Sequence, residues 1–177
     1  MTLRDLSFAP LLTPGQIAAR VGELGRELSA ALDTGAADAP LVVGVLNGAA
    51  IFHADLVRAC TLDLEVAYLR TRSYRGTAST GEVEVRWPDD LDVAGRRVVI
   101  VEDVVDSGLT LTRLVIATRE RGAAAVTSVV LLDKPTARRV PFVPDAAGFA
   151  IDEAFVVGYG LDYDGLGRNL AGVWQRR

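Results

Sequence analysis

Several residue types are scarce in this sequence, and each scarcity excludes a kind of site. Cys60 is the one cysteine, so no internal disulfide framework is possible, which suits a reducing compartment. One cysteine and one histidine cannot build a structural zinc site. No apolar run is long enough to span a bilayer, and the first residues lack the pattern of a signal peptide. We therefore expect a cytoplasmic protein that does not bind a membrane.

Positive charge is also scarce. The net charge of −4 leaves no basic surface for nucleic acid, so we predict no nucleic-acid partner. Lysine is scarcer still, because Lys134 is the single lysine among 19 basic residues. A compact ammonium and a planar guanidinium make different contacts, so the sequence raises the question of what Lys134 binds.

The apolar residues that are present follow the periods of strands and helices. A continuous apolar run of strand length, typical of a strand buried on both faces, occurs at 41–46, and 96–103 and 126–132 are predicted to be further buried strands. Helical spacing of apolar residues follows Thr13-Pro14, Asn47-Gly48 and Gly108, and Gly35 and Gly122 are plausible helix ends. This strand–helix alternation predicts an α/β protein, and 177 residues suit a single domain.

Two segments depart from this alternation. Residues 71–82 are small and polar between two predicted strands, and such a long loop is usually functional or disordered, so we predict a mobile loop. The tail from Pro141 has short strand-like pieces and many glycines, which predicts a small appendage.

The strongest chemical signal follows the run at 96–103. Glu102 and Asp103 lie at the carboxyl end of a predicted strand, where open α/β sheets bind ligands. Residues 106–110 (DSGLT) then form a turn that opens a helix. Backbone amides at a helix start bind phosphate, and Gly108 allows close approach. Acidic residues beside a phosphate site indicate contacts to sugar hydroxyls or to a hard cation such as Mg²⁺. An ordinary helix cap is the simpler alternative for an isolated Asp-Ser-Gly.

The segment 98–114 resembles the phosphoribosyl pyrophosphate (PRPP) signature of type I phosphoribosyltransferases. Other segments are similar to those of the hypoxanthine-guanine phosphoribosyltransferases: 41–59, 73–83, 129–139 and 148–170. The resemblance covers nearly the whole chain in order. It implies the type I phosphoribosyltransferase fold, a mainly parallel sheet flanked by helices. It also implies one domain over 1–177, with a small hood from about 1–12 and 141–177.

The resemblance implies a role for each matching residue. Asp106 would be the general acid/base at N7 of the purine, Lys134 would contact the C6 oxygen, and Ser73 and Tyr74 would cover the reacting bond. PRPP would be bound by Leu46, Asn47, Gly48, Glu102, Asp103, Asp106, Ser107, Gly108, Leu109, Thr110 and Arg168. The base would be bound by Lys134, Phe155, Val156 and Asp162. Mg²⁺ would be bound by Glu102 and Asp103, and a second Mg²⁺ by Asp162 together with pyrophosphate.

The implied reaction is purine salvage. Phosphoribosyl would move from PRPP to N9 of hypoxanthine or guanine, giving IMP or GMP and pyrophosphate, with Mg²⁺ as cofactor. The family also commonly forms homodimers or homotetramers. Asn47 departs from the family, which often has lysine there; it keeps a hydrogen-bonding side chain without positive charge. The peptide at this point can be cis in the family.

Three other classes of protein share features with this sequence. A receiver domain carries its acidic pair on its first strand, and too few residues follow Asp103 for the rest of that fold. A nicotinamide-binding domain needs a G-x-G-x-x-G turn, which the sequence lacks. A non-catalytic nucleotide-sensing or RNA-binding regulator on the same fold is the remaining alternative. His53 is predicted to have a packing or surface role, and Phe155 would be read as a core aromatic without the resemblance.

Overall fold

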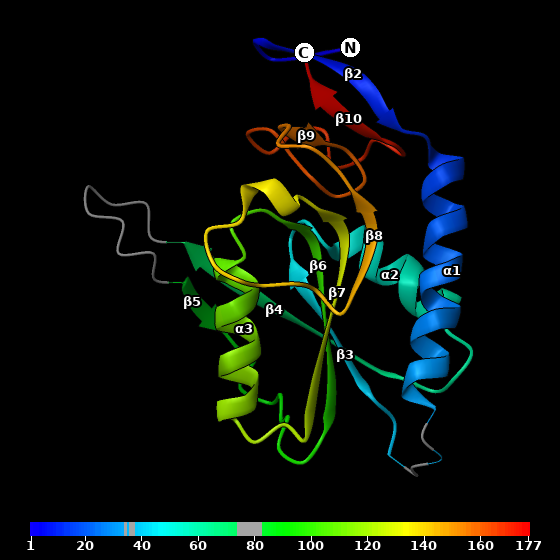
Figure 1. The fold of residues 1–177 in the computed structure, drawn as a ribbon, viewed down its shortest axis with the longest axis vertical. Helices are drawn as coiled ribbons and strands as arrows, with labels where there is room; N and C mark the ends of the chain where they lie inside the picture. Colours follow the sequence, from blue (N-terminus) through cyan, green and yellow to red (C-terminus); the bar gives the residue numbers. More distant parts are fainter. Residues whose placement is uncertain (34, 36–37, 74–82) are drawn as a thin grey trace.

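The computed structural model describes residues 1–33, 35, 38–73 and 83–177. Its centre is a six-stranded sheet in the order β5-β4-β3-β6-β7-β8 (Figure 1). All strands are parallel except β5, which pairs antiparallel with β4 at one edge. This confirms the predicted α/β class. The strands are β3 (Leu41–Leu46), β4 (Glu65–Ser73), β5 (Val83–Arg86), β6 (Arg97–Val105), β7 (Ala125–Asp133) and β8 (Ala146–Ala150).

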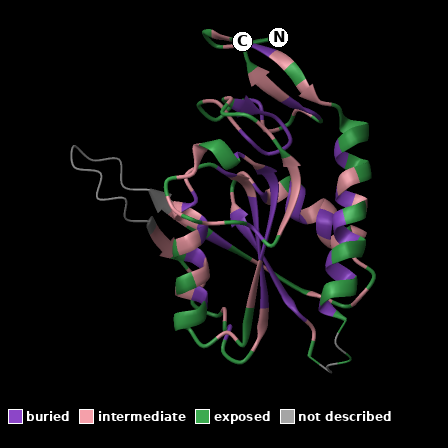
Figure 2. Cartoon of the chain, in the orientation of Figure 1, coloured by how far each residue is buried: buried purple, intermediate pink, exposed green. Residues whose placement is uncertain are grey.

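Helices cover both faces of this sheet. In Figure 1, α1 (Pro14–Leu32) and α2 (Ala50–Ala59) lie on one face, and α3 (Leu109–Glu120) lies on the other. Side chains alternate along each strand, so Val42 packs with α1 and α2 whereas Val43 packs with α3. The central strands are therefore buried on both faces (Figure 2), which explains their continuous apolar runs.

The helix boundaries agree with the local sequence signals. Thr13 caps α1, because its hydroxyl accepts a hydrogen bond from the backbone N–H of Gln16. The Gln16 side-chain oxygen accepts one from the backbone N–H of Thr13, which completes a capping box. Gly108 begins α3 in a left-handed conformation with φ of 82°, and Gly122 follows its end with φ of 88°. These features arise within a few residues, so the sequence predicts them directly.

A second, antiparallel sheet forms a hood above the carboxyl ends of the main strands (Figure 1). It joins the two ends of the chain, because β2 pairs with β10, and β10 with β9. The predicted hood from terminal segments is therefore present. Its strands are β1 (Thr2–Leu3), β2 (Leu6–Leu12), β9 (Val156–Val157) and β10 (Val173–Arg176).

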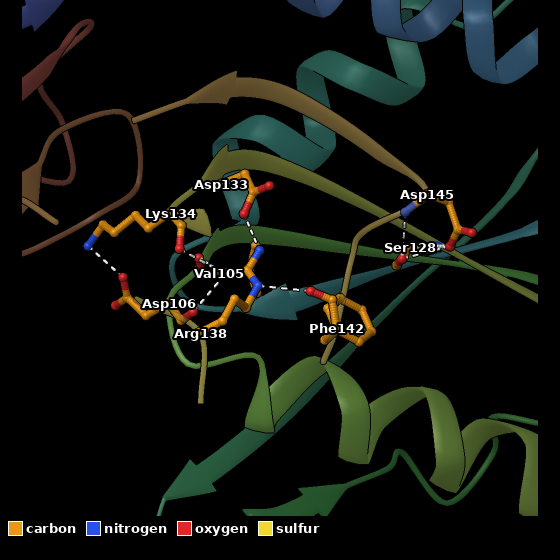
Figure 3. A network of polar contacts seen from close by, with 8 residues as sticks. All are labelled: Val105, Asp106, Ser128, Asp133, Lys134, Arg138, Phe142 and Asp145. Atoms are coloured by element: carbon orange, nitrogen blue, oxygen red, sulfur yellow. Dashed lines mark hydrogen bonds and ion pairs between the residues drawn. The ribbon is translucent and has the colours of Figure 1, made fainter. Parts of the chain in front are cut away.

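One predicted boundary of the hood is wrong. We placed all of 141–177 in the hood, but β8 is the edge strand of the main sheet and pairs parallel with β7. Asp145 fixes this pairing, since its carboxylate accepts hydrogen bonds from the backbone N–H and hydroxyl of Ser128, each at 2.7 Å (Figure 3). The sequence indicated a short strand-like piece here, but its pairing with β7 is a long-range contact that no local pattern predicts.

The packing role predicted for His53 is confirmed, whereas the predicted mobile loop stays a prediction. His53 has the packing role: it is fully buried, and its ring nitrogens contact the Val42 carbonyl and the Tyr68 hydroxyl. Burial lowers the pKa of this imidazole. The predicted loop 71–82 lies largely outside the described residues, as does Tyr74, while Ser73 ends β4.

Candidate active site

Two carboxylates lie near the carboxyl end of β6, Glu102 buried and Asp103 half-buried. Glu102 and Asp103 are adjacent, and Asp103 Oδ1 accepts a hydrogen bond from the backbone N–H of Val104 at 2.7 Å. Burial raises the pKa of Glu102 well above the usual carboxyl range, and the neighbouring Asp103 charge adds to the effect. Burial also raises the pKa of Asp103. The pair is therefore costly to ionise without a cation or strong donors, which are what a Mg²⁺–PRPP complex brings.

The loop at the end of β3, residues 46–48, packs directly against this pair. The Leu46–Asn47 peptide bond is cis. A Cβ atom at Gly48 would lie 1.6 Å from Asp103 Oδ2, and one at Gly160 would lie 2.1 Å from the Gly48 carbonyl oxygen. Gly48 is thus sandwiched between the Asp103 carboxylate and the backbone of Gly160. The sandwich brings three segments of the chain into contact at one point.

The turn at 106–110 forms a small pocket at the start of α3. The pocket has a volume of about 200 Å³ and is lined by residues that include Asp106, Ser107, Gly108 and Thr110. The Ser107 hydroxyl accepts a hydrogen bond from the backbone N–H of Leu109 at 3.4 Å. Amides and hydroxyls at a helix start suit a phosphate group, so the phosphate site at this turn stays a prediction.

Lys134 and Asp106 form an ion pair beside this turn. Lys134 Nζ lies 2.7 Å from Asp106 Oδ1 (Figure 3). The Lys134 side chain is 9% exposed, whereas the Asp106 side chain is 55% exposed. The ammonium is therefore held in a narrow space while the carboxylate faces outward. The structure brings together the two residues that the resemblance assigns to neighbouring atoms on one edge of a purine, the C6 oxygen and N7.

Arg138 is a half-buried residue for which the sequence predicts no role. Its guanidinium donates to the backbone carbonyls of Val105, Asp106, Lys134 and Phe142, and it pairs with the Asp133 carboxylate (Figure 3). The only hint in the sequence was its position four residues after the single lysine. No periodicity marks such a contact, because all its partners lie on turns and strand ends.

The hood contributes an aromatic side chain. Phe155 is 44% exposed, and its ring packs edge-on against Tyr163 with centroids 5.7 Å apart. It is therefore not a core aromatic, and a face remains available for stacking. Val156 is buried in β9.

Asp162 and Arg168 form a second ion pair near the carboxylates. Arg168 Nη2 lies 2.6 Å from Asp162 Oδ1, and Arg168 Nη1 donates to the Gly160 carbonyl. The positive charge of Arg168 also acts to lower the pKa of Asp103, against the larger effect of burial. Among the described residues no three acidic, histidine or cysteine side chains form a group that could hold a metal ion. Asp162 is paired with Arg168 in this structure, and its role as a ligand of a second Mg²⁺ stays a prediction.

Replacing Glu102 with glutamine is expected to stabilise the ligand-free protein at neutral pH. Because burial raises the Glu102 pKa in the folded state, its proton contributes stability below about pH 4.3, which is lost as pH rises through the raised pKa. Glutamine is neutral throughout, so we expect a gain of roughly 0.5–2 kcal/mol at about pH 8 that shrinks towards about pH 4.

Urea unfolding with a chelator and without PRPP measures this gain. Glu153→Gln, at an exposed position, is the matched control and should show no such pH dependence. An equal change in both variants, or a loss of stability in Glu102→Gln at neutral pH, would contradict the assignment of a costly buried charge.

Comparison with known proteins places this site in a family. A family model, the phosphoribosyl transferase domain, matches residues 13–164. The hypoxanthine-guanine phosphoribosyltransferase of Bacillus subtilis (strain 168) is 44% identical over 162 residues, which cover 90% of this chain and 88% of that protein. The hypoxanthine phosphoribosyltransferase of Haemophilus influenzae is 40% identical over 162 residues, 90% of each chain.

A solved structure agrees with these relatives. The hypoxanthine phosphoribosyltransferase from Trypanosoma cruzi, in complex with the product IMP, has a TM-score of 0.89 and 34% identity, covering 100% of this chain and 97% of that one. The sheet order, the hood and the signature at 98–114 thus occur in a chain similar to known enzymes along nearly its whole length. The chain belongs to the phosphoribosyltransferase family and, within it, to the hypoxanthine-guanine phosphoribosyltransferases.

Proposed function

We propose that this protein transfers the phosphoribosyl group of PRPP to N9 of hypoxanthine or guanine and releases pyrophosphate. The observation that carries the proposal is the Lys134–Asp106 ion pair beside the 106–110 turn. A 6-oxopurine presents an acceptor at C6 and a nitrogen at N7 on one edge. Lys134 would donate to the C6 oxygen and Asp106 would exchange a proton at N7. The relative from Trypanosoma cruzi with IMP bound supports this choice of product.

The phosphoribosyl group would lie between the two turns. The amides and hydroxyls at 106–110 would bind the 5′-phosphate, and Glu102 and Asp103 would receive the ribose hydroxyls. The 46–48 loop would bind pyrophosphate through its backbone, with Arg168 as a charged partner. Phe155 would stack on the purine. The bond from C1′ to pyrophosphate breaks as the bond from N9 to C1′ forms, and the base proton passes to Asp106.

The donor set also fits Mg²⁺ as cofactor. Glu102 and Asp103 are adjacent and disfavoured as free anions, and carboxylate oxygens are ligands that Mg²⁺ prefers. These two residues would hold one ion together with oxygens of PRPP, and Asp162 would bind a second ion together with pyrophosphate. When bound, Mg²⁺ neutralises charge on the departing pyrophosphate.

The experiment that tests the function is pyrophosphate release from PRPP and Mg²⁺ with hypoxanthine, guanine, xanthine or adenine supplied in turn. We expect release with hypoxanthine or guanine and formation of the matching nucleotide. A nucleotide-sensing regulator, the alternative from the sequence, would bind PRPP and release no pyrophosphate with any base.

Changing Lys134 is expected to impair use of 6-oxopurines selectively. A hydrogen bond from a charged group contributes about 1.5–3 kcal/mol, or roughly 10- to 150-fold in kcat/KM. Lys134→Gln removes the charge, and Lys134→Arg keeps it in a planar head too broad for a side-chain space that is 9% exposed. Both variants should lose activity on hypoxanthine and guanine.

Steady-state kinetics with each base measures this loss, and PRPP affinity serves as the internal control because it should change much less. A fully active Lys134→Arg would show that the single lysine has no special contact with the base.

A further inference from the structure

Strand pairing alone does not fix the positions of the Asp106 and Lys134 side chains. The β6–β7 ladder ends where Val105 pairs with Asp133. Asp106 and Lys134 are the next residues on the two strands. One backbone hydrogen bond, from the Lys134 N–H to the Val105 carbonyl at 3.0 Å, extends the pairing by one step. Beyond that point no strand ladder sets the separation of Asp106 from Lys134.

The Arg138 guanidinium supplies the missing connection. Its Nη1 donates to the carbonyls of Val105 at 2.8 Å, Asp106 at 2.6 Å and Lys134 at 3.2 Å (Figure 3). One nitrogen therefore binds the backbone of both residues whose side chains form the ion pair. Arg138 is 15% exposed and its charge is balanced by Asp133, which is equally buried. A half-buried, paired guanidinium with several acceptors is a rigid connection.

The same side chain also anchors the segment that covers the 106–110 turn. Arg138 Nε donates to the Phe142 carbonyl at 2.9 Å. The backbone N–H groups of Arg139 and Val140 donate to the Ser107 carbonyl at 3.0 and 3.3 Å. Val140 and Phe142 also approach the back of Gly108, where a Cβ atom would lie 3.0 Å from each. Arg138 thus contacts the ends of β6 and β7, the start of the 106–110 turn and the segment that packs against that turn.

We propose that Arg138 is a positioning residue that sets the distance between Asp106 and Lys134 and so couples the phosphate turn to the base-reading lysine. It acts through the backbone and does not touch substrate. The inference rests on the proposed function, because it takes Asp106 and Lys134 as the residues that act on the purine. A lysine at 138 could not replace it, since one ammonium cannot span the acceptors from Asp133 to Phe142.

The test is a double-mutant cycle of Arg138→Lys with Lys134→Gln. Arg138→Lys alone is expected to lower kcat/KM for guanine or hypoxanthine by roughly 10- to 100-fold, because small misplacements of reacting groups are that costly. In the Lys134→Gln background the same change should cost less than about threefold, because the geometry it sets is no longer used. A residue that only stabilises the fold would give equal losses in both backgrounds.

The matched control is Arg139→Lys, the same change at the next residue. The Arg139 side chain is exposed and makes no hydrogen bond or ion pair with the described part of the chain. It should stay within about twofold of the wild type. A loss in Arg138→Lys no larger than in Arg139→Lys would overturn the inference, as would equal losses in both backgrounds of the cycle.

Two further outcomes distinguish a failure of this inference from a failure of the proposed function. If the wild type forms no nucleotide with any purine, the proposed function fails; if it is active and the cycle is additive, only the role of Arg138 fails. Should Arg138→Lys not fold, as judged by its melting temperature, Asp133→Asn takes its place in the cycle. It removes the charge that anchors the guanidinium and should show the same dependence on Lys134. If neither variant folds, the network serves stability and the inference is overturned.

Discussion

Asp106→Asn is expected to lower the rate of the chemical step by roughly 10²- to 10⁴-fold, the usual contribution of a positioned acid or base. Asparagine keeps the shape of the side chain but cannot accept a proton. Asp106 is 55% exposed and lies at the edge of the phosphate turn, so the backbone amides that would bind the 5′-phosphate should remain in place. PRPP affinity should therefore change by only a few fold.

Single-turnover rates and PRPP binding, measured separately, distinguish chemistry from binding. Asp90→Asn, an exposed aspartate between β5 and β6, is the matched control and should react at the wild-type rate. An unchanged rate in Asp106→Asn would remove this carboxylate from the chemistry. A loss confined to PRPP affinity would reassign it to binding.

Gly48→Ala is expected to lower kcat/KM for PRPP by roughly 10²-fold or more, because a misplacement of about 1 Å at a reacting site has this effect. The added methyl group would lie 1.6 Å from Asp103 Oδ2 and 2.5 Å from its Cγ, so the carboxylate or the 46–48 loop must move. The carbonyl oxygen of Gly48 cannot retreat freely, since the backbone of Gly160 packs against it. Both groups are proposed to bind PRPP, so its KM should respond most.

Gly15→Ala is the matched control, because a Cβ atom at Gly15 meets nothing within 4 Å in the first turn of α1. The same chemical change there should leave activity intact and add a little stability. Melting temperatures show whether Gly48→Ala remains folded. Wild-type kinetics in a folded Gly48→Ala protein would rule out the sandwiched geometry as a requirement for PRPP binding.

Some features of the polar part of the site can be predicted from the sequence, and others cannot. Glu102 and Asp103, followed by the 106–110 turn, are visible because they are consecutive, and a buried strand before them predicts where they end. Their raised pKa values are not visible, since these depend on how completely other segments bury the carboxylates. The pairing of Asp162 with Arg168 is also not visible in the sequence, and the role of Asp162 as a Mg²⁺ ligand stays a prediction.

By itself, the sequence determined the local features of this protein: the capping box at Thr13, the buried strands, the start of α3 at Gly108 and the acidic pair beside it. Each of these depends on residues within a few positions of one another, where backbone periodicity and capping decide the outcome. Only the tertiary structure decided that Arg138 holds the Asp106 and Lys134 backbones, that Gly48 lies between Asp103 and Gly160, and that β8 joins the main sheet. The physical reason is that the contacts of Gly48 with Asp103 and of Arg138 with Asp106 join residues far apart in the chain, which the order and parallel direction of the strands bring to one end of the sheet.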